Sequence, residues 1–194
     1  MIRTSIYALI AIFALSGTLS ADDLLDGLPP PPPSSLYDIE TESINGTKVP
    51  LRGYRNRVLL IVNITTTGPL VKQIGELEKL YSTFEQDGFS ILAFPSNDFT
   101  WQKRMTARDI TDVCYNTYHV TFPIFALTKI SGSFKDPVYQ FLTNRETNPV
   151  FNEDVSWNFV KFLVGRDGTV IGRYASNVSP EDERIKSAIE KALR

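Results

Sequence analysis

Residues 58–70 have the sequence Val-Leu-Leu-Ile-Val-Asn-Ile-Thr-Thr-Thr-Gly-Pro-Leu, and this stretch decides the fold class. The unbroken β-branched and leucine run at 58–62 predicts a strand that is buried on both faces. A helix is predicted over residues 69–87, because apolar residues recur there at helical spacing. Gly88 can end that helix in the left-handed conformation, and residues 89–94 predict a second buried strand. These segments form one β-α-β unit.

Segments on both sides add strands to this unit. Residues 36–49 predict a hairpin, because Asn45-Gly46 is a two-residue turn signal in which both residues tolerate positive φ. Three more strands are predicted at residues 122–127, 159–164 and 169–174. The last two strands are joined at Asp167-Gly168.

Capping residues mark three more helices. Thr106 caps a helix that runs to about Tyr118, and Pro137 takes the first position of a short helix. Residues 179–182 cap a final helix with an apolar face. The alternation of strands and helices predicts an α/β fold of the thioredoxin type, with a mixed sheet flanked by helices and an amino-terminal hairpin.

The amino-terminal residues predict export and a spacer. Residues 1–21 have a positive start, a short apolar run and small residues, which is the pattern of a secretory signal peptide. The alternative, an uncleaved anchor, is disfavoured because a membrane span needs about 20 apolar residues. Residues 22–35 form a linker whose prolines at 29–33 favour a stiff spacer over a ligand for a proline-binding domain. We therefore expect a secreted protein with one domain at 36–194.

Composition excludes several classes of function. The formal net charge is -2 without a basic block, which argues against sequence-independent binding of nucleic acid. The chain has one histidine, His119, and one cysteine, so the usual metal sites and an internal disulfide are not expected. No Gly-x-Ser-x-Gly turn supports a serine hydrolase.

Four segments, in order and with matching separations, resemble the glutathione peroxidase family over roughly residues 35–193. They are residues 35–63, with the hairpin and first strand; Phe-Pro-Ser-Asn-Asp-Phe at 94–99 followed by Gln102; residues 120–125; and Trp-Asn-Phe at 157–159 with residues 160–168. The resemblance implies an oxidoreductase ancestry and a response to hydroperoxides. It also implies a monomer, because residues 125–137 lack the extra segment of the family's tetrameric members.

The family's chemistry implies a tetrad of Cys or selenocysteine, Gln, Trp and Asn. Gln102, Trp157 and Asn158 match the last three members. The nucleophile position falls on Gly68, or on Thr67 after a one-residue shift. Neither residue can be oxidised by peroxide as a thiolate can.

The surroundings of this position also depart from the family. Ser96 stands where the family usually has Cys, and Lys103-Arg104-Met105 replaces the usual Glu-Pro-Gly. Without a nucleophile, Trp157 and Asn158 have an equally good structural interpretation, in which the Trp fills the core and the Asn bonds backbone.

Cys114 is the one thiol of the chain. Some family members that use thioredoxin carry a resolving Cys in this region. Cys114 shares helical spacing with Ile110 and Val113, however, which predicts a position on the apolar face. We favour a buried packing role over redox use.

Three sequons occur in the chain. Asn45 lies on the predicted hairpin turn, so we expect it to be glycosylated if the protein is secreted. Asn63 ends a buried strand and should be unmodified, and Asn177 is disfavoured by Pro180.

Two functions remain open from the sequence. The first is a catalytically degenerate peroxidase that binds an unknown protein or small molecule, without a cofactor, a metal, a membrane span or nucleic acid. The alternative is a residual hydroperoxide reductase that uses Cys114 in the oxidative stress response. Only this alternative needs glutathione or thioredoxin, as the reductant.

Overall fold

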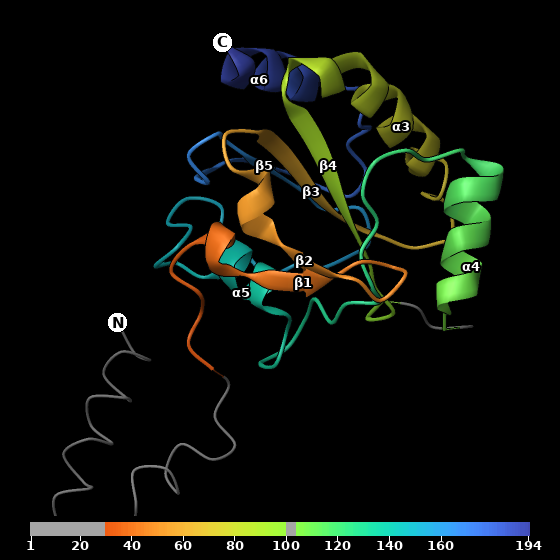
Figure 1. Cartoon of the computed structure of the whole chain (residues 1–194), viewed down its shortest axis with the longest axis horizontal. Helices are drawn as coiled ribbons and strands as arrows, with labels where there is room; N and C mark the ends of the chain where they lie inside the picture. The colour runs from red at the N-terminus through yellow and green to blue at the C-terminus, as the bar shows by residue number, and fades with distance from the viewer. Residues whose placement is uncertain (1–29, 100–103) are drawn as a thin grey trace, which may run out of the picture. The chain divides into compact units, whose positions relative to one another are not determined.

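A computed structural model describes residues 30–99 and 104–194, and Pro32–Arg194 form one compact unit (Figure 1). Its centre is a four-stranded mixed sheet in the order β4-β3-β5-β6. The strands are β3 (Val58–Ile64), β4 (Phe89–Pro95), β5 (Lys161–Val164) and β6 (Val170–Tyr174). β3 runs parallel to β4 and antiparallel to β5, which is antiparallel to β6.

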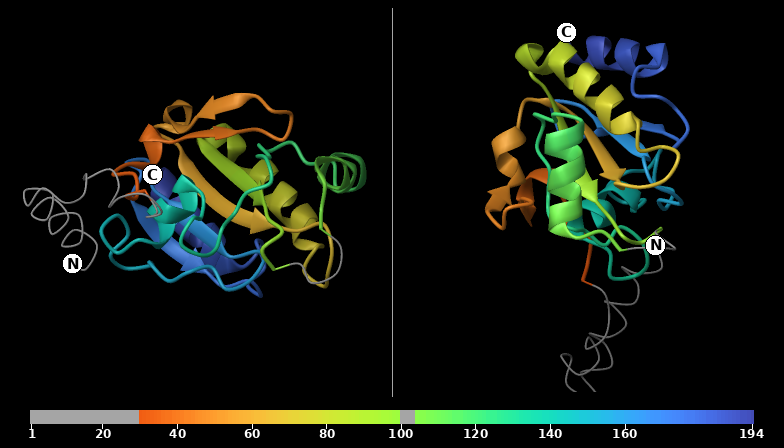
Figure 2. Two further views of the ribbon diagram at one scale, coloured as in Figure 1. Left: turned by 90° about the horizontal axis from the view of Figure 1, so that it is seen from below. Right: turned by 90° about the vertical axis from the view of Figure 1, so that its right-hand side faces the viewer.

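Helices cover both faces of this sheet, so β3 is buried along its whole length. Alternate residues of β3 face opposite sides, because side chains alternate along a strand. Val58, Leu60 and Val62 pack in a cluster with α3 (Gln73–Phe84) and α6 (Glu183–Leu193), which lie side by side (Figures 1 and 2). Leu59 and Ile61 pack in a second cluster with α5 (Pro137–Thr143).

The hairpin is confirmed, but its two-residue turn is wrong. β1 (Glu40–Glu42) pairs with β2 (Lys48–Pro50), and Ser43 donates its N–H to Thr47 O at 2.9 Å. Gly46 has φ +85°, whereas Asn45 is not among the residues with positive φ. The Ser43 and Asn45 side chains bond within the turn and hold a three-residue loop in place of the predicted one.

Two predicted boundaries also change. The helix predicted from residue 69 begins at Gln73, because the chain first makes tight turns in which Val71 N–H donates to Gly68 O. Gly88 ends this region at φ +94°, as predicted, after a short turn η4 (Glu85–Asp87).

Residues 122–127 do not form a strand. Pro123 lacks an N–H, and only a bridge between Ile124 and Ala93 and one between Phe125 and Ser43 form.

The remaining elements follow their capping signals. Thr106 and Asp109 form a capping box at α4 (Ala107–Thr111). This helix continues as a wider π-helical segment, η5 (Asp112–Thr117), which the sequence pattern did not predict. Asp136 caps α5, and Asp182 caps α6. Two further short turns, η2 (Leu36–Asp38) and η3 (Leu51–Tyr54), flank the hairpin.

Candidate functional site

The candidate site lies where the parallel strands β3 and β4 end together. Ile64 is paired with Pro95, and Ser96 donates its N–H to Ile64 O at 3.1 Å. Beyond β3 the chain rises to the surface within a few residues, because Thr65 is 4% exposed whereas Thr67 and Gly68 are exposed. Thr67 and Gly68, the two residues predicted at the nucleophile position, are therefore accessible to solvent.

Gly68 has a backbone conformation that suits glycine. Its φ is +93°, a left-handed value that costs other residues about 1–2 kcal/mol. An added Cβ would meet no heavy atom of residues 30–99 and 104–194 within 4 Å. Among these residues nothing obstructs a side chain at Gly68, and the strain lies in the backbone.

Met105 brings a sulfur atom to this junction. Thr66 donates its N–H to Met105 Sδ at 3.0 Å, and the Thr65 hydroxyl lies 3.6 Å from the same atom. Asn97 fixes the Met105 backbone from both sides, because its Oδ1 accepts the Met105 N–H at 2.8 Å and its Nδ2 donates to Met105 O at 3.1 Å. Sequence analysis identified Met105 only as a departure from the family pattern.

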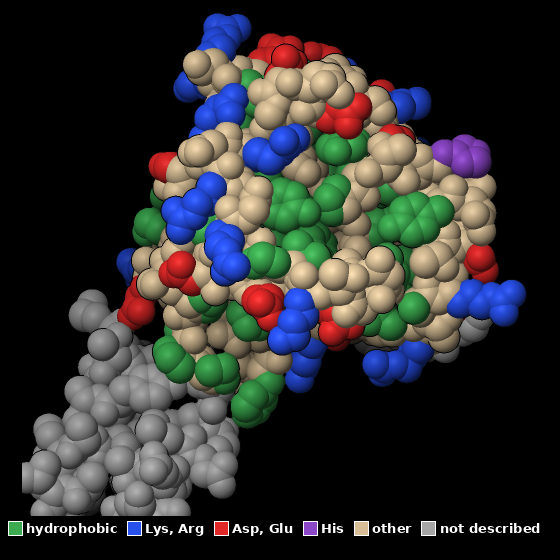
Figure 3. All heavy atoms as spheres, viewed as in Figure 1, with side chains coloured by type: hydrophobic (Ala, Val, Ile, Leu, Met, Phe, Trp, Pro, Cys, Tyr) green, Lys and Arg blue, Asp and Glu red, His purple; other side chains and the backbone are tan. Residues whose placement is uncertain are grey.

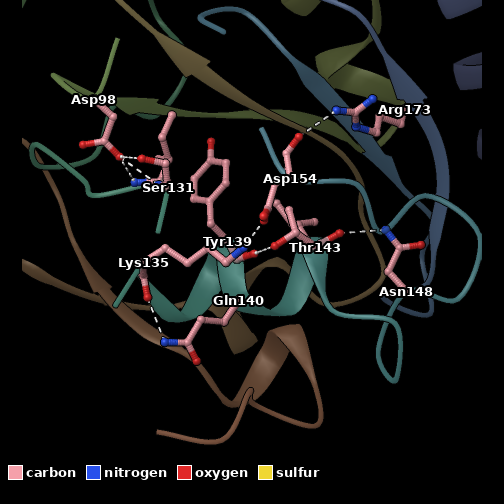
Figure 4. A network of polar contacts seen from close by, with 11 residues as sticks. Asp98, Ser131, Lys135, Tyr139, Gln140, Thr143, Asn148, Asp154 and Arg173 are labelled. Carbon is pink, nitrogen blue, oxygen red and sulfur yellow. Dashed lines mark hydrogen bonds and ion pairs between the residues drawn. The ribbon is translucent and has the colours of Figure 1, made fainter. Parts of the chain in front are cut away.

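Neighbouring Asp98 anchors the same stretch of chain to another loop. Its Oδ2 accepts hydrogen bonds from the Ile130 N–H, the Ser131 N–H and the Ser131 hydroxyl, each at 2.8 Å (Figure 4). In the same view, Tyr139 of α5 lies between Asp98 and Asp154. Two successive residues after β4 therefore tie down two loops: Asn97 bonds the Met105 backbone, and Asp98 bonds Ile130 and Ser131.

Trp157 does not fill the core. Its side chain is 41% exposed, and its ring lies 5.9 Å from that of Phe99, centroid to centroid. Asn158 is 5% exposed, and its Oδ1 has no hydrogen-bond partner among residues 30–99 and 104–194. The structural interpretation of both residues is therefore wrong for Trp157 and unsupported for Asn158.

Asn63 makes the backbone bonds that hold the Trp157–Asn158 segment. Its Nδ2 donates to Trp157 O at 3.0 Å, and its Oδ1 accepts the Val160 N–H at 3.0 Å. Its own carbonyl accepts the Phe159 N–H at 2.7 Å. Phe159 has φ +65°, an unusual value for a bulky residue, and these bonds keep it there. Full burial of Asn63 agrees with its predicted lack of a glycan.

A buried lysine that the sequence analysis missed lies beneath the start of α3. Lys161 is fully buried and donates to Gln73 Oε1 at 2.5 Å and to Val178 O at 2.6 Å. Burial lowers the pKa of Lys161 to about 7. A lysine inside the apolar run 159–164 was the available sequence signal.

Cys114 lies in the core, as its helical spacing predicted. Its exposed fraction is 0%, and it packs in the same cluster as Ile110. Burial raises the pKa of the Cys114 thiol to about 12, so the thiol is protonated at neutral pH. Among the described residues, no hydrogen bond links Cys114 to Thr65, Thr66 or Thr67.

Other predicted residues lie at the surface or cannot be placed. Gln102 falls outside the described residues, so its place in the tetrad stays a prediction. Asn45 is exposed on its hairpin turn.

Lys and Arg side chains gather along the side of one face that carries the carboxyl terminus, with Asp and Glu among them (Figure 3).

The described residues hold neither a membrane-spanning helix nor a cluster of metal ligands. None of their helices is long and apolar enough to cross a bilayer. No three His, Cys, Asp or Glu side chains of residues 30–99 and 104–194 are grouped as metal ligands would be.

Comparisons with known proteins agree with the geometry. A family model described as "Glutathione peroxidase" matches residues 36–143. The chain is 40% identical to "Glutathione peroxidase homolog BsaA" of Halalkalibacterium halodurans, over 82% of this chain and 99% of that protein. It is 37% identical to "Glutathione peroxidase-like peroxiredoxin gpx1" of Schizosaccharomyces pombe, over 82% of this chain and 99% of that protein.

Solved structures show the same fold. "Crystal structure of Trgpx in apo form" is similar with a TM-score of 0.65 and 31% identity, over 82% of this chain and 95% of that chain. A thioredoxin family protein from Chlorobium tepidum has a TM-score of 0.59 at 16% identity, over 87% of this chain and 99% of that chain, and it shows the fold alone. The predicted thioredoxin-like mixed sheet flanked by helices is confirmed.

Proposed function

The chain belongs to the glutathione peroxidase family, and from that premise we propose that it is a secreted, catalytically degenerate member that acts as a binding protein. One observation carries this proposal. Thr67 and Gly68 occupy the exposed junction, whereas the one thiol of the chain, Cys114, is fully buried. A thiol must ionise and meet peroxide before it can react. Cys114 does neither in this fold, because it is fully buried and burial raises its pKa to about 12.

The binding role is supported by what surrounds the junction. Trp157 offers an exposed ring, and Asn158 Oδ1 has no hydrogen-bond partner among the described residues. A buried amide oxygen without a partner is costly, and a ligand that donates a hydrogen bond would remove the cost. Gln102 would add a further amide if it takes the family's position. We propose no cofactor and no metal, and the partner is a protein or a small molecule.

Export and glycosylation form part of the same proposal. Residues 1–21 have the composition of a signal peptide, and Asn45 presents its sequon on an exposed turn. The Asn45 Oδ1 accepts the Thr47 N–H at 3.2 Å, while the side chain stays at the surface. A mass shift of the secreted chain after glycosidase treatment, absent in Asn45→Gln, tests this part.

The π-helical segment favours a second candidate function. Cys114 lies within η5, and π-helical turns often occur at functional sites. Opening of η5 would expose the thiol and allow a hydroperoxide reductase that takes electrons from glutathione or thioredoxin. "Hydroperoxy fatty acid reductase gpx1" of Synechocystis, 35% identical to this chain, is one relative with a named reductase activity.

Peroxide consumption separates the two candidates. The mature chain and its Cys114→Ser variant are each supplied with hydrogen peroxide and with glutathione, or with thioredoxin and its reductase. We expect no turnover above background in either protein. Turnover that disappears in Cys114→Ser would establish the reductase instead. Turnover that survives in Cys114→Ser would contradict both candidates, because no thiol would remain.

A further inference from the structure

The outer edge of β1, on the side away from β2, is paired over only part of its length. Ile44 donates its N–H to Ile124 O at 3.0 Å, and Ala126 donates its N–H to Glu42 O at 2.8 Å. Residues 124–126 therefore run antiparallel to residues 42–44. Beyond Ala126, the described residues do not continue this ladder along β1.

Thr128 directs the neighbouring segment away from β1. It donates its N–H to Pro95 O at 2.8 Å and its hydroxyl to Ala126 O at 2.7 Å. In an antiparallel ladder, the N–H and C=O groups of alternate residues point to the same side of the strand. The N–H and C=O of Glu40 and the N–H of Glu42 therefore face the space between β1 and residues 126–128. A strand edge of this kind is a template for another strand.

A cavity of about 450 Å³ occupies this space. Its lining combines β1 and residues 126–128 with Lys48 of β2 and Asp136 at the start of α5. The volume lies within the range of ligand sites in proteins. Leu127 is 41% exposed and offers an apolar contact at the wall of the cavity.

Carboxylates outnumber cations around the cavity. Glu40, Glu42 and Asp136 line it, whereas Lys48 is the one cationic side chain in its described lining. Lys48 lies 3.1 Å from the Glu40 carboxylate, but both side chains are mostly exposed, so this ion pair is weak. Asp136 Oδ1 accepts the Val138 N–H, and burial raises the pKa of this carboxyl. A cation beside Asp136 would stabilise its charged form.

We propose that this groove binds an extended basic peptide, which adds to β1 as an antiparallel strand. The peptide would continue the direction of residues 124–126 and pair with the free backbone groups of Glu40 and Glu42. These two side chains lie on the same face of the strand, so they favour Lys or Arg at alternate positions of the peptide. They also disfavour a second copy of β1, because like charges on opposed strands repel.

This site goes beyond the binding role proposed for the junction after β3. It shares no residue with Thr67, Gly68, Trp157 or Asn158. Recognition would rest on backbone pairing and on two exposed carboxylates, so it requires neither a thiol nor an intact redox site.

Fluorescence anisotropy with a labelled Thr-Val-Lys-Val-Lys-Val-Thr peptide tests the proposal on the purified chain. We expect saturable binding. Methylation of both lysine amide nitrogens, which would face β1, should weaken binding about tenfold. Methylation of the two central valine nitrogens, which would face away from β1, should weaken it less. Absence of saturable binding, or equal affinities of the two methylated peptides, would overturn the proposal.

Matched variants test the role of charge. Glu40→Gln combined with Glu42→Gln should weaken binding of the unmethylated peptide about fivefold, because two exposed ion pairs are lost. Glu190→Gln, at an exposed glutamate of α6, should leave the affinity unchanged. Equal affinities in the double variant and the parent would overturn recognition by these carboxylates.

Hydrogen exchange locates the bound peptide. At saturation the Glu42 amide should exchange about tenfold more slowly than in the free chain, because it would gain a backbone partner. An unchanged Glu42 rate would place the peptide elsewhere and overturn the proposal. Sedimentation of the free chain should show a monomer. A dimer that the peptide dissociates would assign the groove to a second copy and would likewise overturn the proposal.

Discussion

The residues that follow β3 and the residues that precede β5 lie next to each other but differ in how far they keep the family pattern. After β3, Thr67-Gly68 stands at the proposed nucleophile position, and the preceding Thr66 donates its N–H to Met105 Sδ. Before β5, Trp157 and Asn158 match the resembled pattern, and Asn63 makes three hydrogen bonds to the backbone of this segment, at Trp157 O, Phe159 N–H and Val160 N–H. Under the proposed function, the comparison implies that the framework of a redox site persists without its reactive atom.

The largest effect should come from breaking the kept segment. Asn63→Ala removes the hydrogen bond to Trp157 O and the one from the Val160 N–H, and it leaves the Val160 N–H buried without this partner. We expect a loss of about 3 kcal/mol in the free energy of unfolding, measured by urea denaturation. Asn177→Ala, at an exposed asparagine, is the control and should change stability little. An equal loss in both variants would mean that the Asn63 bonds carry no special weight.

A smaller effect should depend on pH. The pKa of Lys161 is about 7 in the folded chain, below that of an unfolded lysine, so the unfolded chain binds the extra proton above pH 7. Stability should therefore rise with pH, on the order of 2 kcal/mol between pH 7 and 9. Lys161→Met should remove this rise, whereas Lys48→Met, at an exposed lysine, should keep it. The same slope in Lys161→Met would assign the rise to other groups.

The smallest change in the free energy of unfolding is expected at Thr67-Gly68. Gly68→Ala should cost about 1 kcal/mol, because φ +93° is left-handed and no described residue lies within 4 Å of the added Cβ. Thr67→Ala, at the neighbouring exposed residue, should cost less. Urea denaturation of both variants measures the difference. A stabilised Gly68→Ala would show that the turn relaxes to another conformation.

The parts of the fold that the sequence predicted rest on local patterns. β3, α3 and β4 have apolar runs and spacings that only buried strands and a packed helix explain. Gly88 ends the region of α3, and Asp136 caps α5. Residues 122–127 have a strand's composition, but Pro123 prevents the ladder from continuing. The hairpin turn depends on side-chain bonds from Ser43 that the Asn45-Gly46 signal does not contain.

The sequence points to candidate site residues only where they belong to a recognisable motif or spacing. Thr67, Gly68, Trp157 and Asn158 follow from the family pattern, and Cys114 from helical spacing. The structural roles of Asn63 and Met105 were not predicted, because each depends on a partner far along the chain. Asn63 bonds Trp157, and Met105 accepts from Thr66. The burial of Lys161 was not predicted, because it depends on the packing of α3 against the segment after β6.

The central claim is that the framework remains while the reactive atom is missing, and one titration tests it most directly. In Gly68→Cys combined with Cys114→Ser, the single thiol should have a pKa below the usual value and react with hydrogen peroxide faster than free cysteine. Lys48→Cys in the same background, at an exposed residue of β2, should behave as an ordinary exposed thiol. A Gly68→Cys thiol that titrates and reacts like free cysteine would contradict the account, because the residues kept before β5 would then support no redox chemistry.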